Sequence, residues 1–236
     1  MPAPLKPITS WSYSRYALWK KCPAQFKYKH IDKIGPPVEA PAMLRGTEIH
    51  KEFQKYLEGA GRVAPKSLGD FGKEAQVIRE LAKKNPAAVV IEETWALRRD
   101  WSWTVYNDWS GCWLRIKLDA AHFDDHNVVR VTDLKTGKFR PQDNADYALQ
   151  LELYALGALL KWPDPKTVVR PRLAYVDVGV VHETRAYTML DTPALKKTWE
   201  ARVKPMMADT SFKPTPSDFA CRYCDFSKSK GGPCKY

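Results

Sequence analysis

The sequence predicts an α/β (α+β) fold in which helices flank a mixed central β-sheet. Two observations predict it. Segments with helical periodicity come first, near 12–30, 42–59 and 71–84, and a block of runs rich in β-branched and aromatic residues follows them. A further helical segment near 144–161 then separates this block from more strands. The order of helices, antiparallel strands, a helix and further strands is typical of a mixed sheet.

The individual elements follow from local patterns. The helix near 42–59 carries Ile49, Phe53 and Tyr56 at helical spacing, which gives it one apolar stripe. Leucines recur in the same way along the helix near 144–161. The remaining elements are strands near 87–98, 101–107, 112–123, 127–135, 168–177 and 180–188, and a helix near 192–206.

Composition and charge restrict the class of protein. At 236 residues and 44% hydrophobic residues, the chain is long enough for one good core and is expected to form a single domain. No apolar run approaches the length of a membrane span, and the first residues lack a secretory signal, so we expect a cytoplasmic protein without a membrane partner. The 38 Lys and Arg exceed the 27 Asp and Glu, and a net charge of +11 favours a polyanionic partner.

Asp119, Asp133 and Lys135 are the main candidates for chemistry. Because side chains alternate between the faces of a strand, Asp133 and Lys135 share a face, and Asp119 stands on the polar face of its own run. The run that ends in Asp133 is β-branched, and a hairpin through residues 124–127 would place it beside the run that contains Asp119. Two carboxylates would then converge on one point.

These residue types suit metal-dependent cleavage of phosphodiesters. Mg2+ usually takes one or two carboxylates together with waters and phosphate oxygens. A metal held by Asp119 and Asp133 would lower the pKa of a bound water, while Lys135 would hold the water or stabilise the transition state. The alternative is that Asp119 caps a strand end and Asp133 pairs with Lys135 on a solvated edge, since an Asp-x-Lys triplet alone is weak evidence.

Gln150, Tyr154 and His50 lie on helices, beside apolar stripes. Gln150 and Tyr154 are four residues apart and therefore share a helix face. Gln150 is best explained as a positioning residue on a helix that packs across the active-site strands, whereas Tyr154 suits the core and the site equally. From its helix alone, His50 is an exposed residue or borders a cleft.

Aromatic and basic residues are interleaved in Trp11–Lys21, and aromatic residues recur in Trp101–Tyr106. Such residues can stack bases while lysines follow phosphates. The alternative, packing in the N-terminal helix and in a β-hairpin, is the more typical role for most of them.

Four of the five cysteines have the arrangement of metal ligands. Cys221 and Cys224 form a C-x2-C pair that places two thiolates on one turn, and Cys234 follows in a Gly-Gly-Pro loop. Cys22, which precedes a proline, would complete the set and staple the two chain ends together. Four free thiols, with Cys112 buried in its strand, are the alternative.

Taken together, the motifs resemble the RecB nuclease-domain branch of the PD-(D/E)XK superfamily. The matching motifs, in family order, are Ser10-Trp-Ser-Tyr-Ser-Arg-Tyr16 with Cys22-Pro23, Arg45-Gly-Thr-Glu-Ile-His50, Asp119, Asp133-Leu-Lys-Thr-Gly-Lys138, Gln150 with Tyr154, and the late cysteines. The resemblance implies a restriction-endonuclease-like core. It also implies that His50, Asp119 and Asp133 bind the catalytic metal.

In the same resemblance, Lys135 matches the catalytic lysine, and Gln150 and Tyr154 match a motif that lines the site. A histidine ligand suits manganese better than magnesium, so we expect Mg2+ or Mn2+ as the cofactor.

The cysteine layout resembles the iron-sulfur subset of the family, which includes the AddB nuclease domain and CRISPR-associated nucleases. This resemblance implies a structural [4Fe-4S] cluster, for which structural Zn2+ is the alternative. The four ligands would be Cys22, Cys221, Cys224 and Cys234. We expect residues 1–236 to form a single nuclease domain, with a core at about 40–206 and an iron-sulfur module formed by 10–30 together with 207–236.

The resemblance implies a metal-dependent DNA nuclease, with exonuclease action expected, in recombination, repair or phage DNA processing. The expected partners are single-stranded DNA or duplex ends, and a helicase or a recombinase. A non-catalytic nucleic-acid-binding subunit that keeps the fold is the alternative, against which the intact Asp119, Asp133 and Lys135 argue. A metal-thiolate redox or sensor protein would explain the cysteines alone.

Overall fold

A computed structural model describes residues 8–35, 41–124, 126–140 and 144–236. The helices are α1 (Tyr13–Lys21), α2 (Pro23–Phe26), α3 (Pro41–Leu57), α4 (Gly72–Lys84), α5 (Asn144–Lys161), α6 (Thr192–Ala208) and α7 (Asp218–Arg222), with short 3-10 or π-helical turns at Lys27–Ile31, Lys66–Phe71, Pro86–Ala88, Met189–Asp191 and Lys228–Lys230. The strands are β1 (Val89–Ile91), β2 (Thr94–Leu97), β3 (Trp103–Thr104), β4 (Leu114–Lys117), β5 (Ala120–Phe123), β6 (Val128–Lys135), β7 (Val168–Tyr175), β8 (Val180–Glu183) and β9 (Tyr187–Thr188).

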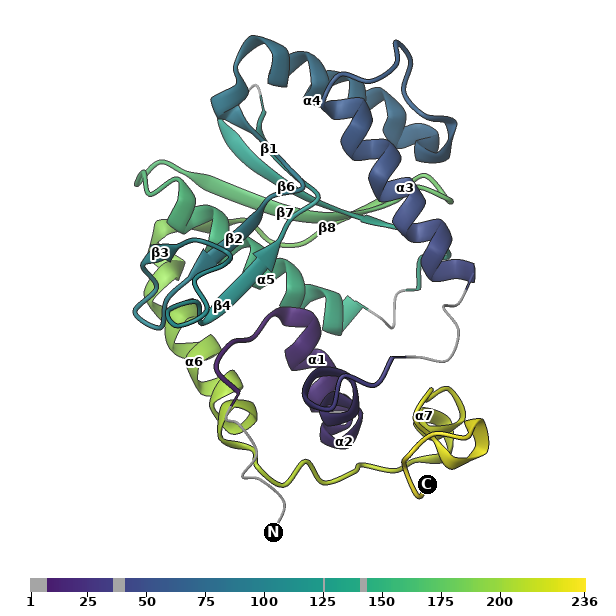
Figure 1. Cartoon of the computed structure of the whole chain (residues 1–236). Coiled ribbons are helices and arrows are strands. Elements are labelled where there is room, and N and C mark those ends of the chain that lie inside the picture. The colour runs from purple at the N-terminus through teal and green to yellow at the C-terminus, as the bar shows by residue number, and fades with distance from the viewer. Residues whose placement is uncertain (1–7, 36–40, 125, 141–143) are drawn as a thin grey trace.

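The central sheet is mixed, which confirms the predicted fold class. It has six strands in the order β1-β5-β6-β7-β8, with β9 also paired to β7, and a second sheet of three strands has the order β3-β2-β4. Strands β6 and β7 are parallel, whereas β5 and β6 form the expected antiparallel hairpin. Helices α3 and α4 cover one face of the central sheet and α5 lies across the other (Figure 1).

Two segments predicted as continuous strands are each interrupted in the middle, so those two predictions were wrong. The segment 87–98 forms β1 and β2, and the segment 112–123 forms β4 and β5. In each case one half joins the central sheet and the other half joins the small sheet. The Glu92 N–H donates to the Asp119 carbonyl at 2.9 Å, which holds the two breaks side by side. Both breaks therefore carry an acidic residue.

Other predicted boundaries also changed. The helix near 12–30 is interrupted at Cys22, which is extended (φ −161°), and α2 restarts at Pro23, a residue suited to a first helical turn. Of the strand near 101–107 only β3 forms, and the strand near 180–188 divides into β8 and β9. The other predicted helices and strands are present within a few residues.

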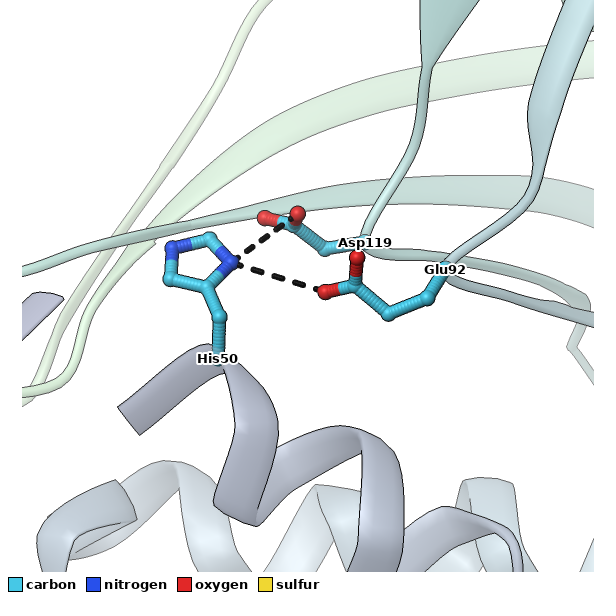
Figure 2. A group of neighbouring side chains, drawn as sticks. All are labelled: His50, Glu92 and Asp119. Carbon is cyan, nitrogen blue, oxygen red and sulfur yellow. Dashed lines mark hydrogen bonds and ion pairs between the residues drawn. The ribbon is translucent and has the colours of Figure 1, made fainter. Parts of the chain in front are cut away.

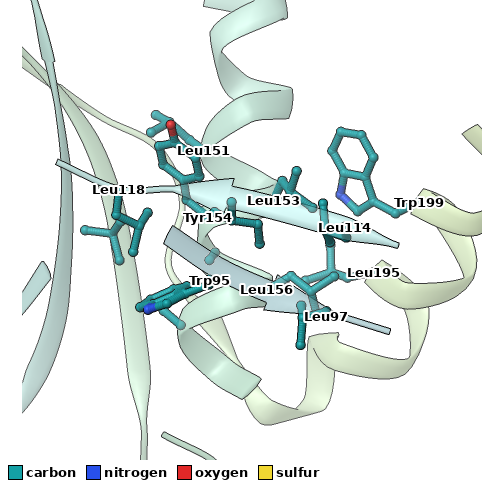
Figure 3. Close-up of a cluster of buried hydrophobic side chains, with 14 of the residues drawn as sticks. Trp95, Leu97, Leu114, Leu118, Leu151, Leu153, Tyr154, Leu156, Leu195 and Trp199 are labelled. Carbon is teal, nitrogen blue, oxygen red and sulfur yellow. The ribbon is translucent and has the colours of Figure 1, made fainter. Parts of the chain in front are cut away.

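The main core lies between α5, α6 and the strands (Figure 3). Leucines of α5 such as Leu153 and Leu156 pack there with Trp95 of β2 and Trp199 of α6. A Cβ on Gly157 would lie 2.8 Å from Trp95 and Ile116 side-chain atoms, so α5 approaches the strands as closely as glycine allows. Trp11, Tyr16 and Trp101 are buried in this core, so for them the packing interpretation is confirmed.

The N-terminal helices lie against the C-terminal segment that follows α6. Phe26 stacks on Phe212 with ring centroids 6.1 Å apart, and the Trp19 indole N–H donates to Asp209 at 2.8 Å. Tyr28 packs on Phe226, which anchors the segment around α7 beyond α2. None of the helices within the described ranges is long and apolar enough to cross a membrane.

Candidate active site

Three side chains from separate elements converge at the paired strand breaks (Figure 2). His50 reaches in from α3, and its Nδ1 lies 3.0 Å from Asp119 Oδ1 and 3.6 Å from Glu92 Oε1. One ligand atom from each residue lies within 4.8 Å of the other two. Two carboxylates and an imidazole grouped in this way form a donor set suited to Mg2+ or Mn2+.

Asp133 and Lys135 adjoin this group from β6. The Asp133 side chain is held at both oxygens, because Oδ2 lies 2.7 Å from Lys135 Nζ and Oδ1 accepts from the Tyr154 hydroxyl at 3.0 Å. Gln150 Nε2 also donates to Asp133 Oδ1, at 3.2 Å, and to the Tyr154 oxygen at 2.7 Å. Gln150 and Tyr154 thus fix the rotamer of the carboxylate, and Tyr154 belongs both to the core and to the site.

Asp119 is linked to the same strand through the backbone. Its Oδ2 accepts from the Leu134 N–H at 2.7 Å, next to Asp133 in the chain. The structure therefore brings together all six residues that the sequence suggested for this site, which are His50, Asp119, Asp133, Lys135, Gln150 and Tyr154.

The carboxylates of the site favour positive charge on their neighbours. Burial, and then the charge of Asp133, raise the pKa of Asp119, while His50 opposes both effects. Burial lowers the pKa of His50, but hydrogen bonds to Asp119 and Glu92 outweigh it and raise this pKa to about 10. The pKa of Lys135 is likewise raised, because Asp133 outweighs the effect of burial. An imidazolium and an ammonium therefore balance the carboxylates, and a divalent cation would take over the role of the imidazolium proton.

Glu92 was missed in the sequence. Its backbone lies in the left-handed region (φ 47°), which costs a non-glycine residue roughly 1–3 kcal/mol. The buried carboxylate lies 3.0 Å from Lys117 Nζ. Burial raises the pKa of Glu92, but hydrogen bonds from His50 and Lys117 outweigh it and lower the pKa. The only sequence signal was an acidic pair, Glu92-Glu93, inside an otherwise apolar run.

The four cysteines suggested as ligands also come together. Cys22, Cys221, Cys224 and Cys234 line one pocket between the chain ends. Burial, and then the neighbouring thiols of Cys22, Cys234 and Cys221, raise the pKa of Cys224. The fifth cysteine, Cys112, is buried in the main body of the protein and does not line this pocket.

The sheet topology and the flanking helices define a restriction-endonuclease-like fold, with acidic residues and a lysine gathered where its strands break. The model of the PD-(D/E)XK nuclease superfamily matches residues 10–229, and the chain belongs to this superfamily. No curated protein matches the chain.

Two solved structures are similar over most of their length. One is the crystal structure of SSO0001, at 16% identity and a TM-score of 0.47, covering 98% of this chain and 87% of that one. The other is described as a "Putative exonuclease" from Eubacterium rectale, at 13% identity and a TM-score of 0.49, covering 97% of this chain and 90% of that one.

Proposed function

We propose that this protein is a metal-dependent deoxyribonuclease that hydrolyses phosphodiester bonds and acts as an exonuclease. The observation that carries the proposal is the convergence of His50, Glu92, Asp119, Asp133 and Lys135 on one point. Membership of the PD-(D/E)XK nuclease superfamily and the net charge of +11 support it. Exonuclease action, a role in recombination, repair or phage DNA processing, and a helicase or recombinase partner rest on the resemblance to the RecB branch.

The residues divide the chemistry between them. His50, Asp119 and Asp133 would hold Mg2+ or Mn2+, as the sequence suggested, and Glu92 would join them as a further ligand. The ion supplies Lewis acidity toward the scissile phosphate and toward a bound water. Lys135, paired with Asp133 at 2.7 Å, is positioned to orient that water or to stabilise charge on the phosphate. Gln150 and Tyr154 keep Asp133 in place, so their removal should lower the rate without removing a ligand.

We further propose that the four cysteines hold a structural [4Fe-4S] cluster, with Zn2+ as the alternative. The lining of one pocket by all four cysteines supports a shared metal site there. Four thiolates suit either metal group, and the resemblance to the iron-sulfur subset is the reason to favour the cluster over zinc.

Cleavage of defined DNA tests the nuclease proposal. Anaerobically purified protein would be incubated with end-labelled linear and with circular DNA, each with Mg2+, Mn2+ or EDTA. We expect metal-dependent cleavage of linear DNA only, with a loss of at least about 100-fold in Asp133→Asn and Lys135→Met, because electrostatic stabilisation in such sites is worth that much. Arg62→Ala, which removes an exposed cation outside the site, is the control.

Cleavage of circular DNA would show endonuclease rather than exonuclease action. If the wild type and both variants bind DNA but are equally inert in every metal, the non-catalytic binding subunit would replace the nuclease.

A further inference from the structure

A groove of about 670 Å³ leads to the metal site from the small sheet. At its inner end are Gln150 and Tyr154, which hold Asp133, and Lys117, which pairs with Glu92. At its outer end are Tyr106 and Trp109, from the loop that joins β3 to β4. The groove therefore connects the aromatic loop to the residues that surround the metal site.

The charge of the groove is positive and only partly balanced. The described residues that line it include three cations, Arg15, Arg115 and Lys117, and no carboxylate. Neither Arg15 nor Arg115 forms an ion pair within the described part of the chain, and Arg15 instead donates to Ser10 at 3.3 Å. Arg15 and Arg115 line the same groove, and burial, followed by the charge of Arg115, lowers the pKa of Arg15. Such a pair favours an anion between them.

The aromatic side chains at the outer end are held in solvent. Trp109 is 79% exposed and Tyr106 is 55% exposed, although most large aromatic residues of this chain are buried. The Arg115 guanidinium lies over both rings, at 5.1 Å from the Tyr106 centroid and 5.8 Å from that of Trp109. Two exposed rings that share one cation form a stacking surface next to a phosphate-binding charge.

The loop that carries these rings is itself well ordered by hydrogen bonds. The Asp108 carboxylate accepts from the Thr104 hydroxyl at 2.6 Å and from the Gly111 N–H at 2.8 Å. Arg98 donates to the same carboxylate at 3.2 Å. Because the loop is braced in this way, exposure of Tyr106 and Trp109 is a feature of the fold rather than of a loose end.

We propose that this groove holds a single-stranded stretch of DNA, with unpaired bases stacked on Tyr106 and Trp109, phosphates beside Arg15 and Arg115, and the strand directed into the metal site. The inference rests on the proposed nuclease function and names its substrate class. The faces of paired bases are hidden inside a duplex, whereas those of a single strand are free to stack on aromatic side chains. A duplex would therefore have to present an unpaired end here.

Binding without cleavage tests the groove separately from the nuclease activity. In EDTA, the full chain would be titrated into a fluorescent 20-mer of deoxythymidine and, separately, into a blunt duplex of the same length. We expect Tyr106→Ala and Trp109→Ala each to weaken single-strand binding by about 10-fold, as stacking of a base is worth that much. Duplex binding should change by less than about twofold, the scatter expected for exposed substitutions.

Two exposed side chains elsewhere serve as matched controls, Leu190→Ala for apolar exposure and Arg62→Ala for charge. Asp108→Ala should reproduce the loss on the single strand without altering either ring. Equal losses on both DNAs, or no loss in the aromatic variants, would overturn the proposal. Normal binding without any cleavage in metal would instead count against the nuclease alone.

Cross-linking gives a readout that does not depend on folding of variants. A deoxythymidine 20-mer with a single 5-iododeoxyuridine would be irradiated with the wild-type protein, and the tryptic peptide that gains mass would be identified. We expect the peptide Asp100–Arg115, which contains both rings. A cross-link confined to peptides outside the groove would contradict the assignment.

Discussion

Glu92 shows at the scale of single residues how a site can be hidden from sequence. Its carboxylate is buried between His50 and Lys117, and its backbone accepts an unfavourable left-handed geometry. The alternation of side chains along a strand predicts which face of the sheet an aspartate or glutamate occupies. Glu92 lies between two strands, where this alternation does not apply. Left-handed backbone also occurs at Lys33, Trp101, Asn127 and Phe212, so the contact of the Glu92 carboxylate with His50, rather than its backbone, marks it as a candidate ligand.

Glu92→Gln should weaken Mn2+ binding by about 10-fold or more, because it removes one negative ligand and keeps the shape of the side chain. Titration of Mn2+, with the free ion followed by electron paramagnetic resonance, measures this. The adjacent Glu93→Gln is the matched control, since Glu93 is half-exposed and pairs with Lys161 at 3.3 Å. Equal affinities in the wild type and Glu92→Gln would remove Glu92 from the site.

A second prediction for a single residue concerns the effect of His122 on the pH dependence of stability. Burial first, and then the positive charge of Arg172, lower the pKa of His122 to about 4, while Asp124 opposes them and Arg130 adds to them. Unfolding returns this pKa to about 6.5, so the folded state favours the neutral ring. The contribution of His122 is therefore present above pH 6.5 and is lost as the pH falls from 6.5 toward 4.

Between pH 7 and pH 5, His122 alone should lower the free energy of unfolding by about 2 kcal/mol. Urea unfolding of the wild type and of His122→Gln at both pH values isolates this contribution. The quantity to compare is the change in the free energy of unfolding with pH, because the substitution also alters packing at every pH. Identical slopes against pH in the two proteins would show that His122 does not titrate on unfolding.

At the scale of elements, helices and the β5–β6 hairpin were predictable, whereas the strand breaks were not. Helical periodicity places α3 and α5 directly, and local turn and strand signals place the hairpin that carries Asp133. The breaks arise from a contact between distant segments, the hydrogen bond from Glu92 to Asp119. Apolar residues continue on both sides of Asp119, so the local pattern contains no stop signal there.

The same distinction between local patterns and long-range contacts explains which parts of the site could be predicted. The residue types and the shared face of Asp133 and Lys135 could be deduced from strand parity. The contact of His50 with Asp119, across 69 positions, depends on how α3 crosses the sheet. From the sequence, only the resemblance to a known family suggested His50 as a candidate ligand.

At the scale of the whole molecule, the pocket of four cysteines joins the two ends of the chain. Cys22 lies at the break between α1 and α2, and the other three cysteines lie in and after α7. Within the described residues, Phe26 on Phe212, Tyr28 on Phe226 and the hydrogen bond from Trp19 to Asp209 also join the N-terminal helices to the C-terminal segment. A bound cluster would add to the order of residues 207–236, as metal binding does in other small modules.

Cys22→Ser should then release the C-terminal segment while the central sheet stays folded, because it removes the one ligand supplied by the N-terminal side. Iron, zinc and sulfide analysis of anaerobically purified protein, together with limited proteolysis, measures both consequences. We expect iron and sulfide in equal amounts in the wild type, their loss in Cys22→Ser, and new cleavage confined to 207–236. Cys112→Ser is the matched control, since Cys112 lies apart from the pocket and its thiol contacts the Leu114 carbonyl at 3.6 Å. Zinc without sulfide would establish the alternative metal. If the wild type contains neither metal, and both variants resist protease as well as the wild type does, packing alone joins the ends.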